Sequence, residues 1–103
     1  LDTIKLLYPL KDDRQSIEYY NKTIKKLEEH DLKHGGNLLK TLDCFFRCDM
    51  NKKVTAAKLY IHIETLRYRL NKIESLTGYS LNTSEGVFIL QMNLKLHQIL
   101  KLK

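Results

Sequence analysis

The side chains best suited to chemistry gather in one stretch near the middle of the chain. From residue 61 to residue 72 the sequence runs Ile-His-Ile-Glu-Thr-Leu-Arg-Tyr-Arg-Leu-Asn-Lys, so that cations and hydroxyl groups are interleaved with leucines. Guanidinium, ammonium and hydroxyl groups donate hydrogen bonds to phosphate oxygens and to the acceptors on base edges. This stretch therefore indicates binding to a polyanion.

The distribution of charge points the same way. The net charge is +6, from 18 Lys and Arg against 12 Asp and Glu. Residues 1–34 balance seven basic against seven acidic groups, whereas residues 47–72 carry seven basic and two acidic groups. A local excess of this kind attracts nucleic acid or an acidic membrane surface. A solvated lysine-rich surface without a partner explains the charge equally well, so charge alone does not decide the function.

Other function classes find little support in the sequence. It contains no Ser-His-Asp signature, glycine-rich phosphate loop or recognisable acid pair, so we expect no enzymatic activity and no cofactor. No stretch approaches 18 uncharged apolar residues, so we expect no membrane span. Cys44 and Cys48 could hold only one side of a metal, and a disulfide between them would strain a helix. We expect free thiols and no metal, and the low cysteine count fits a reducing compartment.

The elements that position these groups are predicted to be helices throughout. Glycine and proline are scarce and apolar residues recur at helical spacing, which predicts an all-α bundle of five or six helices. Helices are expected over residues 2–8, 13–30, 38–47, 53–60, 64–76 and 84–100. We expect Asn37 to cap the third helix, Gly78 to end the fifth in the left-handed conformation, and residues 82–85 to begin the last.

The predicted core follows from the inward faces of these helices. The expected core residues are Ile17, Tyr20, Ile24, Leu27, Leu39, Leu42, Phe45, Phe46, Leu66, Leu70 and Ile73. The last helix is apolar nearly all round, so it either lies deep in the core or keeps one face for a partner. The chain begins with Leu1 and not with methionine, which suggests a piece of a longer protein. We expect residues 1–35 to lead in from an upstream region and residues 36–103 to form one domain.

Residues 54–70 read as a helix, a short turn and a second helix. The small side chain of Ala56 allows the second helix to cross closely over the first. This is the helix-turn-helix arrangement, whose second helix enters the major groove of DNA. If Leu66, Leu70 and Ile73 face inward, the second helix projects its other side toward solvent, with Arg67 and Lys72 on the flanks of Glu64, Thr65, Tyr68 and Arg69.

The run from Ile61 to Gly78 strongly resembles the C-terminal helix-turn-helix of the PucR/CdaR regulators, which are bacterial transcription regulators of purine catabolism and sugar-diacid use. The resemblance extends back through Leu38-Leu39-Lys40-Thr41-Leu42 to Leu27 and forward to Leu100, and the arrangement is also similar to the Fis-type helix-turn-helix. It implies a cytoplasmic regulator that binds double-stranded DNA through this domain. It also implies that an upstream region senses a small-molecule effector.

The resemblance also implies which residues contact DNA. His62, Ile63 and Thr65 are candidate groove contacts, and Arg67, Tyr68 and Arg69 are candidate base or phosphate contacts. Lys52, Lys53 and Lys58 are expected to add long-range attraction, and Lys72 is a further candidate contact at the flank of the exposed face. Glu64 departs from the family, which usually has asparagine there. We interpret Glu64 mainly as a favourable charge at a helix N-terminus, with readout of cytosine as the alternative.

Several of these positions have a second interpretation. Arg67 and Arg69 point about 200° apart on a helix, so they cannot both face DNA, and Arg69 could pair with an acid on another helix. His62 could cap the helix, Thr65 could bond to the local backbone, and Tyr68 could merely cover the surface.

We expect the helix over residues 64–76 to lie in the major groove. One such helix reads few base pairs, so useful specificity predicts a homodimer whose recognition helices lie roughly 34–36 Å apart. The alternative function is a helical protein-interaction or dimerisation module whose basic charge is incidental.

Overall fold

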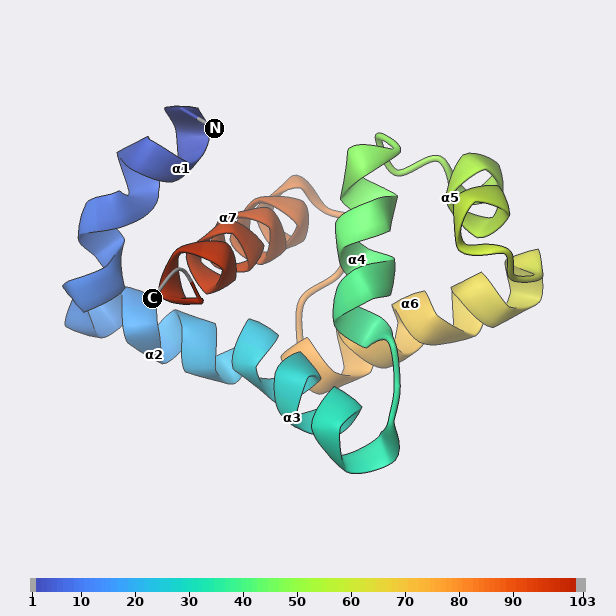
Figure 1. Ribbon diagram of the computed structural model, residues 1–103, viewed down its shortest axis with the longest axis horizontal. Helices are drawn as coiled ribbons and strands as arrows, with labels where there is room; N and C mark the ends of the chain where they lie inside the picture. The colour runs from blue at the N-terminus through green and yellow to red at the C-terminus, as the bar shows by residue number, and fades with distance from the viewer. Residues whose placement is uncertain (1, 102–103) are drawn as a thin grey trace.

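A computed structural model describes residues 2–101 and shows an all-α fold (Figure 1). Its helices are α1 (Asp2–Leu7), the 3-10 helix η1 (Tyr8–Asp12), α2 (Arg14–Lys22), α3 (Ile24–His34), α4 (Leu38–Arg47), α5 (Lys52–Leu59), α6 (Ile63–Thr77) and α7 (Ser84–Leu100). The predicted fold class is confirmed. Within the described residues there are seven α-helices and not five or six, because the helix expected over residues 13–30 is two helices.

Thr23 separates α2 from α3. Its backbone leaves the helical region (φ −120°, ψ −90°), and its hydroxyl donates to the carbonyl oxygen of Tyr19 at 2.8 Å. A threonine that bonds back to the preceding turn bends or breaks a helix. The break does not disturb the predicted apolar stripe, since Tyr20, Ile24 and Leu27 are all buried on the two sides of it.

The start of α4 is capped by a residue that sequence reasoning did not identify. The side chain of Asn37 makes no capping hydrogen bond, so that prediction was wrong. The carboxylate of Asp31, on α3, instead accepts hydrogen bonds from the backbone N–H groups of Leu38 (2.9 Å) and Leu39 (3.1 Å). The left-handed Gly35 (φ 64°) ends α3 and turns the chain back so that Asp31 can reach these groups.

α4 lies at the centre of the half of the molecule that contains α3, α5 and α6. It packs against α3, α5 and α6, and its buried Leu42 and Phe45 belong to the main hydrophobic core. α6 contributes Leu66, Leu70 and Ile73 to the same core, which confirms its predicted inward face. The packing of α6 against α4 in the hydrophobic core therefore fixes the orientation of α6.

α7 closes the other half of the core. It packs against α1, η1, α2 and α3. Its own side chains Leu94, Leu96 and Ile99 are buried in this contact. Phe88, by contrast, is 60% exposed. Figure 1 shows α1 at one end of the long axis and α5 with the N-terminal part of α6 at the other, so α7 leaves that end of α6 uncovered.

The loop between α6 and α7 follows the predicted boundary signals. Gly78 ends α6 in the left-handed conformation (φ 79°), and the hydroxyl of Thr83 caps α7 by accepting from the N–H of Gly86 at 3.0 Å. The carboxylate of Glu74 holds the loop by accepting from the N–H of Leu81 at 2.6 Å. Gly86 has no room for a side chain, because a Cβ there would overlap the backbone carbonyl of Ser80.

Candidate nucleic-acid interface

The turn between α5 and α6 contains three residues and no glycine. α5 ends at Tyr60, which adopts the left-handed conformation (φ 58°). The N–H of Ile61 donates to the carbonyl oxygen of Ala56 at 3.0 Å, which closes the helix end, and Ile61 packs against the core. The ring of Tyr60 is 95% exposed. Ala56 on α5 is buried and belongs to the hydrophobic core.

The α6 outer face is the exposed surface of the first turns of α6, formed by Glu64, Thr65, Arg67, Tyr68 and Asn71. These residues lie opposite the buried Leu66, Leu70 and Ile73. Tyr68 is 67% exposed, and the guanidinium of Arg67 is on the surface and not in the interior. The face therefore presents cationic, hydroxyl and amide groups, which can form hydrogen bonds with the phosphates and base edges of DNA.

His62 caps α6 while remaining exposed. Its Nδ1 atom accepts a hydrogen bond from the backbone N–H of Glu64 at 3.1 Å. The neutral imidazole that accepts at Nδ1 carries its proton at Nε2. The ring thus braces the turn with one nitrogen and keeps a donor available with the other, so the capping interpretation and a DNA contact are compatible.

Glu64 and Arg67 form an ion pair on the α6 outer face. The Nη1 atom of Arg67 donates to Oε2 of Glu64 at 2.7 Å, three residues apart on the helix. Both side chains remain more than half exposed. The first turn of a helix also favours the carboxylate of Glu64, since the backbone N–H groups there are unpaired.

Arg69 points the other way. Its Nη1 atom donates to the hydroxyl of Thr41 on α4 at 3.1 Å, and the side chain is half-buried. The partner is a hydroxyl group and not the acid that the second interpretation named. Arg69 therefore links α6 to α4, and its side chain points away from that of Arg67.

The remaining predicted residues lie on α5 and α6. Lys53 and Lys58 are exposed on α5, while Ile63 and Lys72 are half-buried on α6. Lys52 lines the same hollow, of about 150 Å³, as Arg67 and Asn71. The sequence suggested Lys52 only as a source of long-range attraction and did not indicate Asn71. The spacing of Glu64, Tyr68 and Asn71, four and three residues apart, was the signal that could have identified Asn71.

Two cysteines lie on and just after α4. The sulfur atoms of Cys44 and Cys48 are 4.0 Å apart and both thiols are free and half-buried, as expected. Burial raises the pKa of the Cys44 thiol, which keeps it protonated. Among the described residues no group of three or more His, Cys, Asp or Glu could hold a metal ion.

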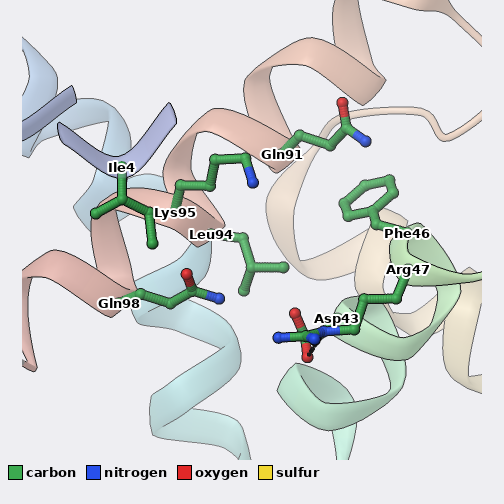
Figure 2. A pocket seen from close by; sticks show the side chains of 8 residues that line it. All are labelled: Ile4, Asp43, Phe46, Arg47, Gln91, Leu94, Lys95 and Gln98. Atoms are coloured by element: carbon green, nitrogen blue, oxygen red, sulfur yellow. Dashed lines mark hydrogen bonds and ion pairs between the residues drawn. The ribbon is translucent and has the colours of Figure 1, made fainter. Parts of the chain in front are cut away.

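A separate cavity of about 410 Å³ lies between α1, α4 and α7 (Figure 2). Its lining includes Arg47, whose guanidinium is paired with Asp43 at 2.9 Å, and Lys95. Arg47 begins the basic segment that the sequence indicated, but it lies beside this cavity and not on the α6 outer face.

Comparison with known families identifies the helix-turn-helix. The model of the PucR C-terminal helix-turn-helix domain matches residues 38–96, from the start of α4 into α7. The chain belongs to this family. The resemblance seen in the sequence is thereby confirmed, and the match favours DNA-binding regulation over the interaction-module alternative.

Several of the relatives are named as transcription regulators. The chain is 31% identical over 90 residues to the DNA-binding transcriptional activator AdeR of Bacillus subtilis, covering 87% of this chain and 21% of that protein. It is 32% identical over 94 residues to the purine catabolism regulatory protein of B. subtilis, covering 91% and 17%. It is 34% identical over 93 residues to the carbohydrate diacid regulator of Escherichia coli, covering 90% and 23%.

The chain thus spans about a fifth of the length of these PucR-family relatives. No solved structure matches it. Within residues 2–101, none of the helices has the length and apolar character needed to cross a membrane.

Proposed function

We propose that this PucR-family domain binds double-stranded DNA by placing the N-terminal half of α6 in the major groove. The observation that carries the proposal is the exposure of Arg67 and Tyr68 on a helix whose opposite face is locked into the core. The proposed contact set comprises His62, Ile63, Glu64, Thr65, Arg67, Tyr68 and Asn71, with Lys52, Lys53, Lys58 and Lys72 near phosphates. Arg69 is left out because Thr41 holds its guanidinium.

The proposal extends to the protein that contains this domain. We place residues 36–103 as the reading domain, with residues 1–35 leading in from an upstream effector-sensing region. The protein acts as a cytoplasmic transcription regulator that binds its operator stoichiometrically and performs no catalysis. Two copies read half-sites about one helical turn apart, roughly 34–36 Å, because a single helix contacts too few base pairs.

The test is the salt dependence of binding to a duplex of random sequence. Each neutralised phosphate releases condensed counterions, so the logarithm of affinity falls with the logarithm of salt concentration at a slope of about −0.9 per phosphate. We expect a steep slope for the wild type and a slope shallower by about 1 for Arg67→Ala. Arg14→Ala, which removes the same charge from the exposed start of α2, serves as the matched control and should leave the slope unchanged.

A flat salt response of the wild type, or an equal change in both variants, would contradict this placement. Both variants should retain the thermal stability of the wild type to within about 0.5 kcal/mol, since both arginines are exposed.

A further inference from the structure

The α6 outer face carries one acidic side chain, and that charge opposes the proposed function. Glu64 is 66% exposed at the side chain and lies in the first turn of α6, where phosphates would approach. Phosphates repel a nearby carboxylate, and only a hydrogen bond donated to it by the DNA can offset this repulsion. An ionised carboxylate is purely an acceptor, and the major groove offers it the amino groups of cytosine N4 and adenine N6.

Arg67 decides which base pair this carboxylate fits. Because the 2.7 Å contact uses Nη1 of Arg67 and Oε2 of Glu64, four guanidinium N–H groups and the second carboxylate oxygen remain free. The ion pair therefore presents an acceptor directly beside a set of donors. A C·G pair presents the complement, with N4 of cytosine about 2.9 Å from O6 of guanine and with N7 as a second acceptor.

An A·T pair fits the same two side chains less well. Adenine also presents a donor, N6, beside an acceptor, N7, but that acceptor receives only one N–H of a guanidinium, and thymine offers only O4 beside a methyl group. Guanine, in contrast, receives both donors of a guanidinium fork. The donor and acceptor pattern of Glu64 and Arg67 thus favours C·G.

We propose that the Glu64–Arg67 ion pair reads one C·G base pair of the operator, with Glu64 accepting from cytosine N4 and Arg67 donating to guanine O6 and N7. This inference rests on the proposed function, because it requires α6 to lie in the major groove. Glu64 is a specificity-determining residue. Its negative charge weakens binding to DNA of any sequence, and a hydrogen bond from cytosine N4 offsets this loss only at a C·G pair. A good bidentate contact discriminates against the wrong base by roughly 5- to 150-fold.

The experiment selects bound sequences from a random duplex pool with the wild type, Glu64→Gln and Glu85→Gln. Glu85 is the matched control, because it is an exposed glutamate in the first turn of α7. We expect the wild type and Glu85→Gln to select the same C·G pair. We expect Glu64→Gln to weaken the preference at that position, because glutamine keeps one neutral acceptor and Arg67 still donates to guanine, while binding random duplex at least as tightly as the wild type.

A second probe removes the donor from the DNA. In a duplex of the selected sequence, pyrimidin-2-one replaces the cytosine and so lacks the 4-amino group. The wild type should lose about 5-fold or more in affinity for this duplex, and Glu64→Gln, whose acceptor is neutral, should lose less.

Three results would overturn the inference. One is an unchanged C·G preference in Glu64→Gln. Another is selection of an A·T pair by the wild type at the position that depends on Glu64. The third is weakened random-duplex binding by folded Glu64→Gln, because loss of a negative charge should not weaken phosphate contacts. Failure of the wild type to bind any duplex would instead overturn the proposed function itself, and the inference with it.

Discussion

Replacing Asp31 with alanine should destabilise the domain much more than replacing Asn37, although Asn37 precedes α4 directly. The carboxylate of Asp31 accepts from two backbone N–H groups at the start of α4, at 2.9 Å and 3.1 Å, whereas the Asn37 side chain caps nothing. Loss of an N-cap costs about 0.5–2 kcal/mol, and a hydrogen bond to a charged group contributes about 1.5–3 kcal/mol. For two such bonds at a half-buried site we expect a loss of about 2 kcal/mol.

The assay is urea unfolding followed by circular dichroism. Asp31→Ala should lower the midpoint without changing the slope and should lower Tm by roughly 8–16 °C, since 1 kcal/mol corresponds to about 4–8 °C in a domain of this size. Asp31→Asn, which keeps one acceptor oxygen, should fall between Asp31→Ala and the wild type. Asn37→Ala should cost less than about 0.5 kcal/mol. A larger loss for Asn37→Ala than for Asp31→Ala would refute the assignment of the cap.

The other predictions concern the core, the α6–α7 loop and pH. Leu70→Ala should lower the free energy of unfolding by about 2–5 kcal/mol in urea titration, because Leu70 is buried under the α6 outer face; an unchanged midpoint would contradict the inward face. Gly86→Ala should cost about 1–3 kcal/mol or more in the same assay because its Cβ would overlap the carbonyl of Ser80, and a neutral result would show that the loop can move aside. Burial lowers the pKa of His97 below its ordinary 6.5, and its Nδ1 atom is hydrogen-bonded to the Tyr20 hydroxyl at 2.8 Å. The histidine of the unfolded chain therefore binds a proton more readily than that of the folded protein. The free energy of unfolding should decline as pH falls from about 6.5 toward the lower pKa of folded His97. His97→Asn should remove this decline, as measured by thermal melts at pH 5 and 7.

Helix positions were largely predictable from the sequence, because they depend on local signals. The left-handed Gly78 and the cap at Thr83 are side-chain and backbone preferences of single residues, and both lie where the sequence indicated. The break at Thr23 was not predictable from periodicity, since the apolar stripe continues across it. The cap of α4 was mispredicted because Asp31 reaches it across a turn that brings together residues seven positions apart.

The candidate site shows the same limit. Its location on α6 followed from the inward spacing of Leu66 and Leu70, which fixes the opposite face geometrically. The engagement of Arg69 with Thr41 required the packing of α6 on α4, which joins residues 28 positions apart in the sequence. The turn conformation of Tyr60 was equally hidden, since tyrosine gives no local signal for a positive φ.

The central claim is that DNA lies against the α6 outer face, and mapping amide NMR shifts during titration with the selected duplex tests it most directly. The account predicts that the largest shifts fall on residues 62–72 and on the N-terminal turn of α5, and that amides around Phe88 on α7 stay nearly unchanged. Shifts centred on α7, with residues 62–72 unaffected, would contradict it.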